Sequence, residues 1–552
     1  MTLHSEYYLV LIETASNQRF IYDTNKLRDN IGASELIHRS TTDWVKAATE
    51  ELGLAEAVER VVSLSGKTVL LVPGRDEARR IIHAVTRRAL DEAPGLALRG
   101  VAGREPIDLD TTKSCDFHRA LTALFAEHER LGSVLPPPEA RLQRLPVVAP
   151  CVRSGLPASR IVHPPGGSAE LLSEQSYAKQ DAARAGWKRI TKSLRKIDPS
   201  LTFYKNISEM EKANQSMDWA GLIHADGNGL GRIFLSFVDA YVEPNEPARA
   251  YINRYRSFSQ ALDDCTCRAF AGALAAWRAE AGRDASKPLP VVPLVLGGDD
   301  LTVLCDGATA VRLAADYLTR FMDATAADED VQAVLRGKPL GVCAGVALVK
   351  PHYPHHAAYD LACDLLDKAK AGKMVFQKDG AVLPFAGLDV HVHLDSSGHA
   401  LDPVRGRQRS GDGRARLTAR PFVVRAPDGA DLDDRARAWM ANRGWEWHER
   451  VMPFMPRGGG GLDAEQRLPN SVLHGLRDAA IDGVEVADAR LRAVLGREMK
   501  DAPHRVATAW AALLGTTDPE TASLFVPLPD KPDDEAQATR LFDALDLMDF
   551  WR

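Results

Sequence analysis

The chain has 552 residues, of which 45% are hydrophobic and 26% charged, and its formal net charge is −6 at pH 7. This length predicts about three or four domains, because single hydrophobic cores rarely grow beyond about 250 residues. The composition is that of a globular protein, and the negative charge argues against a protein that coats nucleic acid through charge alone, although a local basic groove is compatible with it.

The sequence carries no targeting or disulfide signal. No run of 18 apolar residues occurs, and the first residues do not resemble a signal peptide, so we expect a cytoplasmic protein with no membrane partner. Seven cysteines in so long a chain do not predict a disulfide framework. Cys265 and Cys267 form the one close pair, but residues two apart on a helix point in different directions, so no zinc ribbon is expected.

The first part of the chain alternates between strand and helix patterns. The expected elements are a strand at 5–14, a helix at 25–37, a hairpin at 61–72, a helix at 76–90 and a strand at 96–101. The order β, α, ββ, α, β is typical of a ferredoxin-like palm domain, and we assign it to residues 1–133.

The hairpin contains Ser65-Gly-Lys-Thr68, which is similar to part of a phosphate-binding P-loop. That motif needs a glycine five places before Gly66, where Val61 stands, and its lysine should open a helix. Lys67 is instead followed by a Val- and Leu-rich strand pattern, so we do not expect a P-loop.

Residues 134–200 are expected to connect two domains. Prolines and glycines between 134 and 167 predict an extended path, and 182–194 has the periodicity of a helix. Cys151 stands alone in this connection, and one cysteine does not make a zinc site.

Farther along the chain, one acid follows an apolar strand pattern and two more lie between a pair of such patterns. The pattern at 219–225 predicts a buried strand that ends in Asp226, and 293–305 predicts a hairpin whose tight turn is Gly297-Gly-Asp-Asp300. Adjacent carboxylates repel each other unless a cation lies between them. If the strand lies beside the hairpin, Asp226, Asp299 and Asp300 converge and form an oxygen site suited to Mg²⁺ or Mn²⁺.

This segment resembles the palm of GGDD-type nucleotide polymerases and cyclases, as in the large subunit of type III (Cmr/Csm) CRISPR effector complexes and, more distantly, GGDEF diguanylate cyclases. The matching elements follow the family's order over roughly 150 residues. They are Asp226–Gly229, a helix at 257–263, Gly297–Asp300, a strand at 341–350 and a helix at 362–370.

The resemblance implies an α+β protein with two tandem ferredoxin-like palms, of which only the second, at 201–385, is active. Laying the two units over each other places Ala15 on Asp226 and Ser65–Thr68 on Gly297–Asp300, so the fold pattern repeats while the acids do not. We therefore expect a degenerate first palm that supports the second. A dinucleotide fingerprint at Asp226–Gly231 is disfavoured, because its Gly-x-Gly-x-Gly spacing is wrong and no strand with a terminal acid follows.

The resemblance also implies the chemistry and its residues. Two Mg²⁺ or Mn²⁺ ions would be held by Asp226, Gly227, Asp299 and Asp300, with the three aspartates as catalytic residues. The expected nucleotide-binding residues are Gly227, Asn228, Gly229, Gly297, Gly298 and Lys370. Lys350 and Lys373 are further candidate cations for the triphosphate. ATP is the favoured substrate, and a cyclic mononucleotide, dinucleotide or oligonucleotide product is left open.

Residues 386–552 are expected to form a mostly helical C-terminal domain. No His-Asp dipeptide occurs in the sequence, so the HD nuclease domain of many relatives is not expected. The favoured function is a nucleotidyltransferase or cyclase in antiviral defence, alone, as a homodimer or with CRISPR-type effector subunits. The alternative is an RNA-binding scaffold of a ribonucleoprotein, in which the palm binds nucleotide without turnover.

Overall fold

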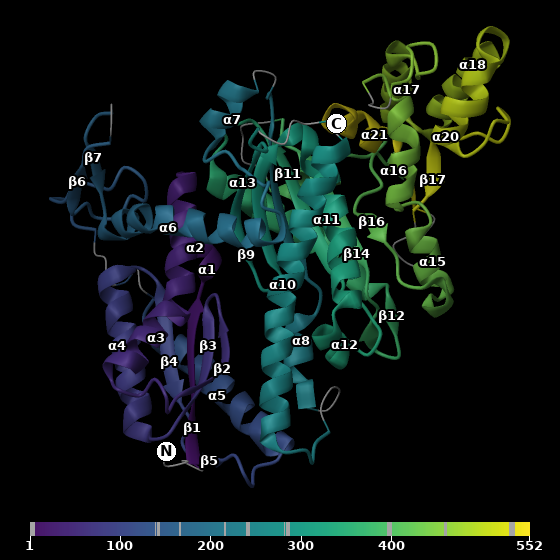
Figure 1. Cartoon of the computed structure of the whole chain (residues 1–552). Helices are drawn as coiled ribbons and strands as arrows, with labels where there is room; N and C mark the ends of the chain where they lie inside the picture. The colour runs from purple at the N-terminus through teal and green to yellow at the C-terminus, as the bar shows by residue number, and fades with distance from the viewer. Residues whose placement is uncertain are drawn as a thin grey trace.

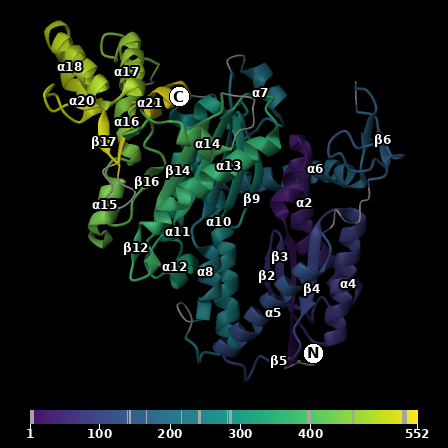
Figure 2. The same ribbon diagram turned by 180° about the vertical axis from the view of Figure 1, so that it is seen from behind.

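The protein is described here by a computed structural model that carries side chains. The structure describes residues 6–551 except 138–139, 141–143, 165–166, 215–216, 239–242, 281, 283–286, 395–399, 458–460 and 529–535. Parts of the proline- and glycine-rich connection expected between 134 and 167 lie outside the described residues. Figures 1 and 2 show two sheets, each with helices packed against it, and a further region of mainly helical elements at the C-terminal end.

The first sheet has the strand order β2-β3-β1-β4, with β5 also paired to β1. Its elements are β1 (Glu6–Ala15), α1 (Asn17–Tyr22), α2 (Leu27–Thr41), α3 (Asp43–Glu51), β2 (Glu59–Leu64), β3 (Lys67–Val72), α4 (Arg75–Glu92), β4 (Ala97–Ala102), β5 (Ile107–Asp108) and α5 (Ser114–Val134). Alternate residues of β1 face opposite sides, as in any strand. Val10 belongs to a core with Ile31 and Ile81 of α2 and α4, whereas Leu11 packs into the core that contains Phe117 of α5.

The connection contributes a small hairpin and two helices. These are β6 (Arg160–Val162), β7 (Glu170–Leu172), α6 (Glu174–Ile197) and α7 (Ile207–Ala213). Helix α6 lies against α2 at close range, because a Cβ on Gly32 would come within 1.7 Å of the Lys179 carbonyl oxygen. Glycine at this position lets the two helix backbones touch.

The second sheet has the strand order β16-β14-β11-β8-β10-β9. Its elements and covering helices are β8 (Ala220–Gly227), α8 (Leu230–Leu235), α10 (Ala248–Glu280), β9 (Val291–Gly297), β10 (Asp300–Asp306), α11 (Gly307–Ala327), α12 (Glu329–Leu335), β11 (Val342–Val349), α13 (His355–Ala369), η2 (Lys370–Met374), β12 (Gln377–Lys378), β13 (Ala381–Val382), β14 (Ala386–Val392) and β16 (Phe422–Arg425). Ile223 packs with the core of α10 and α11, whereas Leu222 faces the core that contains Leu365 of α13.

The two sheets pack into one body along the long helix α10, which runs beside both (Figure 1). Arg249 and Arg256 of α10 both bind Glu59 of β2, at 2.5 and 2.7 Å. On the other side, the ring of Tyr22 stacks on Tyr359 of α13 with centroids 3.5 Å apart. Contacts on both sides thus fix the first unit relative to the second.

The C-terminal region shares a sheet with the preceding unit. Strand β14 pairs in parallel with β11, and β16 pairs with β14, so the residues just after the expected boundary at 385 extend the second sheet. The remaining elements are α14 (Leu401–Gly406), β15 (Ala415–Arg416), η3 (Gly429–Asp431), α15 (Asp434–Met440), α16 (Trp445–Val451), η4 (Met452–Phe454), α17 (Asn470–Asp482), α18 (Val484–Asp501), α19 (Pro503–Arg505), η5 (Val506–Trp510), α20 (Ala511–Leu514), β17 (Phe525–Pro527), β18 (Gln537–Thr539), α21 (Leu541–Leu547) and η6 (Met548–Phe550). Beyond the shared sheet the region is mostly helical, as expected.

Among the described residues, no helix combines the length and the apolar character that crossing a membrane requires. All seven cysteines are free thiols, in agreement with the expectation that they form no disulfide framework. Lys67 is the first residue of β3 and opens no helix, so the P-loop was rightly rejected.

Candidate active site

The strand and the hairpin expected to carry the acids are neighbours in the second sheet. Strands β8 and β10 are antiparallel, with Ala225 opposite Leu301. One residue farther along each strand, Asp226 and Asp300 stand at the same edge of the sheet. The hairpin between β9 and β10 has a two-residue turn, Gly298-Asp299, as the sequence predicted.

The turn brings Asp299 toward the end of β8. Gly298 has φ +62°, a conformation that glycine adopts without strain. A Cβ on Gly227 would lie 2.6 Å from Asp299 Oδ2, so a larger residue at 227 would displace this carboxylate. The three predicted carboxylates therefore come from two strands and one turn that meet at one point.

Two residues of α10 hold the backbone of this turn, and neither was assigned a role from the sequence. The Gly298 N–H donates to Asp263 Oδ1 at 2.8 Å, and Thr266 Oγ1 donates to the Gly298 carbonyl oxygen at 2.5 Å. Burial raises the pKa of Asp263, although the Gly298 hydrogen bond opposes this shift. Both hydrogen-bonding groups of Gly298 are satisfied by one helix, which fixes where Asp299 and Asp300 point.

The acids strongly perturb one another. Burial, followed by the charge of Asp226, raises the pKa of Asp300 to about 7, and the same two causes, with Asp300 added, raise the pKa of Asp299. Asp300 Oδ1 is covered and has no hydrogen-bond partner among the described residues. This site therefore concentrates negative charge that the surrounding side chains only partly neutralise.

A buried histidine lies beneath Asp300. His224 Nδ1 is 3.0 Å from Thr302 Oγ1 and 3.5 Å from Asp300 Oδ1, and Tyr359 covers its other nitrogen at 3.4 Å. Burial lowers the pKa of His224 to about 4, so the ring is neutral at neutral pH and does not compensate the acid. Its signal in the sequence was a single polar residue inside the apolar run before Asp226.

The three candidate lysines lie in different places. Lys370 Nζ forms an ion pair with Asp226, and although burial opposes it, this carboxylate raises the lysine's pKa. Lys373 is half-buried nearby, and burial together with Lys370 lowers its pKa. Lys350 was wrongly included: it follows the opposite end of β11, where Val349 pairs with Ala220, and it lies over Trp219. Val349, at this end of β11, is six residues from Cys343, the residue opposite Asp226, a span of about 20 Å.

The glycine-rich turn after Asp226 is open on one side. Gly229 has φ +78°, and a Cβ there would meet nothing within 4 Å. The Asn228 side chain points inward and donates to the Phe385 carbonyl oxygen at 3.3 Å, while its own oxygen has no partner among the described residues. Contact of Asn228 with a nucleotide therefore stays a prediction, whereas the exposed backbone at Gly229 is accessible.

The donor set is chemically suited to a hard divalent cation, because it consists of carboxylates whose charge is only partly compensated. In the described ranges, no three His, Cys, Asp or Glu side chains are grouped as a ready-made metal cluster. The ion pair between Asp226 and Lys370 contributes to the absence of such a cluster from these ranges, because it turns the Asp226 carboxylate toward an ammonium group.

The same positions in the first sheet carry different residues. The turn between β2 and β3 is Ser65-Gly66, and Leu64 pairs with Lys67 as Gly297 pairs with Asp300. Lys67 therefore matches Asp300, and its partner across the strands, Glu13, matches Asp226. The alignment of Ala15 with Asp226 was therefore wrong by two residues, and the alignment of Ser65–Thr68 with Gly297–Asp300 was wrong by one. Lys67 and Glu13 form an ion pair at 2.8 Å.

Comparison with known proteins relates the second sheet and its helices to one family of domains. Residues 219–379 match the family model described as the second palm domain of Cas10/Cmr2. No curated protein matches the sequence.

Three solved structures illustrate the similarity of fold. The Csm1–Csm4 cassette in complex with AMPPNP has a TM-score of 0.50 and 14% identity, covering 100% of this chain and 70% of that chain. The cassette in complex with cA3 has a TM-score of 0.49 and 14% identity, covering 100% and 70%. Csm1 in T. onnurineus has a TM-score of 0.48 and 16% identity, covering 91% and 67%.

The chain spans about two thirds of the length of these solved chains. Residues 219–379 thus form a palm domain of the Cas10/Cmr2 kind, in a chain that resembles the large subunit of type III CRISPR effector complexes.

Proposed function

We propose that this protein is a nucleotidyltransferase or cyclase that condenses nucleoside triphosphates, preferably ATP, and releases pyrophosphate. The observation that carries the proposal is that Asp226, Asp299 and Asp300 lie at the same edge of the second sheet, where burial and Asp226 raise the pKa of Asp300 to about 7. A site with this much negative charge attracts divalent cations, and the bound cations can in turn bind the anionic triphosphate. A likeness in fold to a chain solved with AMPPNP is consistent with this proposal.

The aspartates would hold two Mg²⁺ or Mn²⁺ ions, with the Gly227 backbone as a further ligand. When bound, such ions lower the pKa of an attacking hydroxyl and neutralise the charge of the triphosphate. A ribose hydroxyl would attack the α-phosphate, and pyrophosphate would leave.

The chain's own residues position this reaction. Asp263 and Thr266 fix the turn, and the open backbone at Gly229 lets phosphates approach. Lys370 would exchange its contact with Asp226 for the triphosphate, so one cation serves the empty and the substrate-bound site in turn.

We further propose that the two sheets are tandem ferredoxin-like palms and that the first is silent. The strand orders β4-β1-β3-β2 and β11-β8-β10-β9 support this assignment. In the first palm Glu13 and Lys67 neutralise each other, so no cation is required to balance charge at that edge of the sheet.

A second candidate function is an RNA-binding scaffold whose palm binds nucleotide without turnover. The ion pair between Lys370 and Asp226 favours it, because a neutralised Asp226 is a weaker metal ligand. For both candidate functions we propose that the protein binds other effector subunits and acts in antiviral defence.

The experiment is incubation of the purified protein with each NTP and Mg²⁺ or Mn²⁺, with and without RNA, followed by pyrophosphate assay and mass spectrometry of the product. We expect turnover that is lost on replacing Asp299 and Asp300 together by alanine. Asp360→Ala, an exposed acid of α13, is the matched control. Copurifying RNA without turnover under any condition would favour the scaffold.

A further inference from the structure

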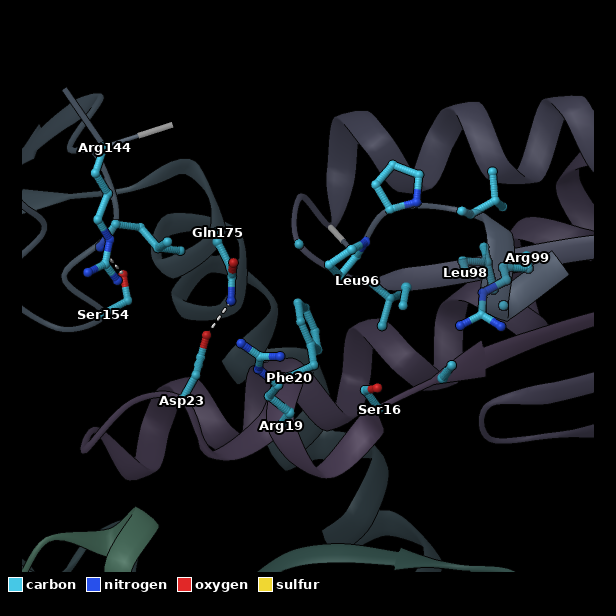
Figure 3. A pocket seen from close by; sticks show the side chains of 18 residues that line it. Ser16, Arg19, Phe20, Asp23, Leu96, Leu98, Arg99, Arg144, Ser154 and Gln175 are labelled. Atoms are coloured by element: carbon cyan, nitrogen blue, oxygen red, sulfur yellow. Dashed lines mark hydrogen bonds between the residues drawn. The ribbon is translucent and has the colours of Figure 1, made fainter. Parts of the chain in front are cut away.

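A cavity of about 370 Å³ lies between the first sheet and the connection, away from the acids of the second sheet. Figure 3 shows side chains from the β1–α1 junction, β4, the end of α5 and the connection around it. None of its lining residues comes from 219–379. Any ligand here would bind independently of the candidate active site.

The walls of this cavity carry a surplus of positive charge. Three arginines line it, Arg19 from α1, Arg99 from β4 and Arg144 from the connection. Its one acidic residue, Asp23, already accepts a hydrogen bond from Lys179 Nζ at 2.5 Å and another from Gln175. Arg99 and Arg144 form no ion pair with any carboxylate in the described part of the chain.

The arginines are spread along the cavity. In Figure 3 Arg144 lies at one end beside Ser154, Arg19 lies near the middle, and Arg99 lies at the opposite end. A Cβ on Gly132 would come 2.1 Å from Arg99 Nη1, so a glycine in α5 leaves room for this guanidinium. A ligand that satisfies several of these groups needs negative charge at more than one point along its length.

Apolar surface separates the charged groups. Phe20 and Leu96 lie between Arg144 and Arg99 in Figure 3, and Leu98, Pro136 and Leu156 also line the cavity. Guanidinium groups match phosphate oxygens through paired hydrogen bonds, and their planar faces stack on rings. The volume lies in the range of about 300–1,000 Å³ that is typical of small-molecule sites.

We propose that this cavity binds a ribonucleotide that carries more than one phosphate, either a free nucleoside triphosphate or a segment of an RNA strand. Successive phosphates of a strand lie on Arg99 and Arg144, whereas the phosphates of a free nucleoside triphosphate lie at one of these ends, and in both cases the base or sugar packs on the apolar wall. Binding through guanidinium groups needs no divalent cation, in contrast to the function proposed for the second palm.

The test is equilibrium binding to the full chain in EDTA, with inorganic tripolyphosphate, ATP and a short RNA oligonucleotide as separate probes. EDTA removes the ions on which the acidic site depends, so this result does not depend on turnover. We expect saturable binding of at least one probe that weakens as salt rises. Preference for tripolyphosphate and ATP identifies the free nucleotide as the ligand, and preference for RNA identifies the strand.

The decisive variant is Arg99→Ala with Arg144→Ala. We expect affinity to fall about ten-fold or more, because each hydrogen bond to a charged group contributes about that factor. Arg99→Lys with Arg144→Lys keeps the charge but loses the paired geometry, and should lie between the two, which guards against a folding defect in the alanine variant. Arg87→Ala, at an exposed position on α4, is the control. Absence of metal-independent binding for all three probes, or equal affinity in the wild type and the double alanine variant, would overturn the proposal.

Discussion

The β2–β3 hairpin of the first sheet and the β9–β10 hairpin of the second both have a turn of two residues, but their charge patterns differ. In the second, Asp226 and Asp300 stand across from each other and Asp299 joins them from the turn. In the first, Glu13 stands across from Lys67 at a distance of 2.8 Å. One backbone arrangement thus supports either a charge-satisfied ion pair or an accumulation of acids that calls for cations.

The residues around the two hairpins also differ. Lys67 lies 4.8 Å from the Phe125 ring centre and His128 reaches within 3.9 Å of Glu13, so an aromatic ring and a histidine border this partly exposed ion pair. Beside the second hairpin the backbone at Gly229 is open. The two hairpins thus differ in a few side chains at the strand ends and in the residues beside them, and not in strand arrangement.

The largest effect is expected when the charge pattern of the first hairpin, an acid opposite a lysine, is placed on the second hairpin. Asp226→Glu with Asp300→Lys should form an ion pair and remove the cation site. We expect nucleotide turnover to fall by about a thousand-fold or more, since two-metal sites supply several kcal/mol of transition-state stabilisation. Pyrophosphate release measures this, with thermal unfolding to show that the variant folds. Turnover within a few-fold of wild type would contradict the assignment of these acids.

Replacing Asp263 or Thr266, the two α10 residues that hydrogen-bond the backbone of Gly298, should have the next largest effect. Thr266→Val and Asp263→Ala each leave one Gly298 group without its partner, at a cost of about 1–3 kcal/mol in stability. We expect kcat to fall about ten- to hundred-fold with little change in KM, because the acids shift while the substrate contacts persist. Steady-state kinetics separate the two parameters.

Asp263→Asn keeps an oxygen that accepts from Gly298 and should restore much of the rate. Asp264→Ala, at the exposed neighbouring position, is the matched control. Equal kinetics for Asp263→Ala and Asp264→Ala would contradict the role of Asp263 in holding the turn.

Stability of the metal-free protein should depend on pH in the direction set by the raised carboxyl pKa values. The pKa of Asp300 is about 7 in the folded protein and near 4 when unfolded, so the folded state binds more protons between these values. Stability should fall as pH rises through this window, by on the order of 1 kcal/mol once partial exposure is allowed for.

Addition of Mg²⁺ should recover this loss, most clearly above pH 7. Thermal unfolding in EDTA and in Mg²⁺ across the pH range measures both effects. Stability that rises with pH specifically through Asp300, judged against Asp300→Asn, would contradict the charge accumulation.

The smallest effect is expected in the first hairpin. Glu13→Gln and Lys67→Met each remove one member of a partly exposed ion pair, so unfolding free energy should fall by less than about 1 kcal/mol. Turnover should not change, because these residues lie outside the acidic site. A large loss of activity in either variant would show that the first sheet takes part in the chemistry.

Much of the site could be predicted because its signals are local. A tight turn rich in glycine and a strand that ends in an acid are visible in the amino-acid sequence, and they indicate where Asp226, Asp299 and Asp300 lie. Lys370 follows a helix whose end is near the same edge and forms an ion pair with Asp226, while its contact with a triphosphate stays a prediction.

What was missed depends on register and on distant contacts. Alternation of apolar residues does not fix which residue faces which, so Ala15 was matched to Asp226 where Glu13 belongs. Asp263 reaches Gly298 across 35 residues, and no spacing in the sequence reveals that contact. The pairing of β14 with β11 was hidden for the same reason, because a parallel neighbour is set by tertiary packing.

The most direct test is the number of Mn²⁺ ions bound in the presence of a non-hydrolysable ATP analogue, measured by calorimetry or electron paramagnetic resonance. We expect about two ions per chain in the wild type, and their loss when Asp226, Asp299 and Asp300 are replaced together by asparagine. An unchanged number of bound ions in that variant would contradict a metal site at this edge of the second sheet.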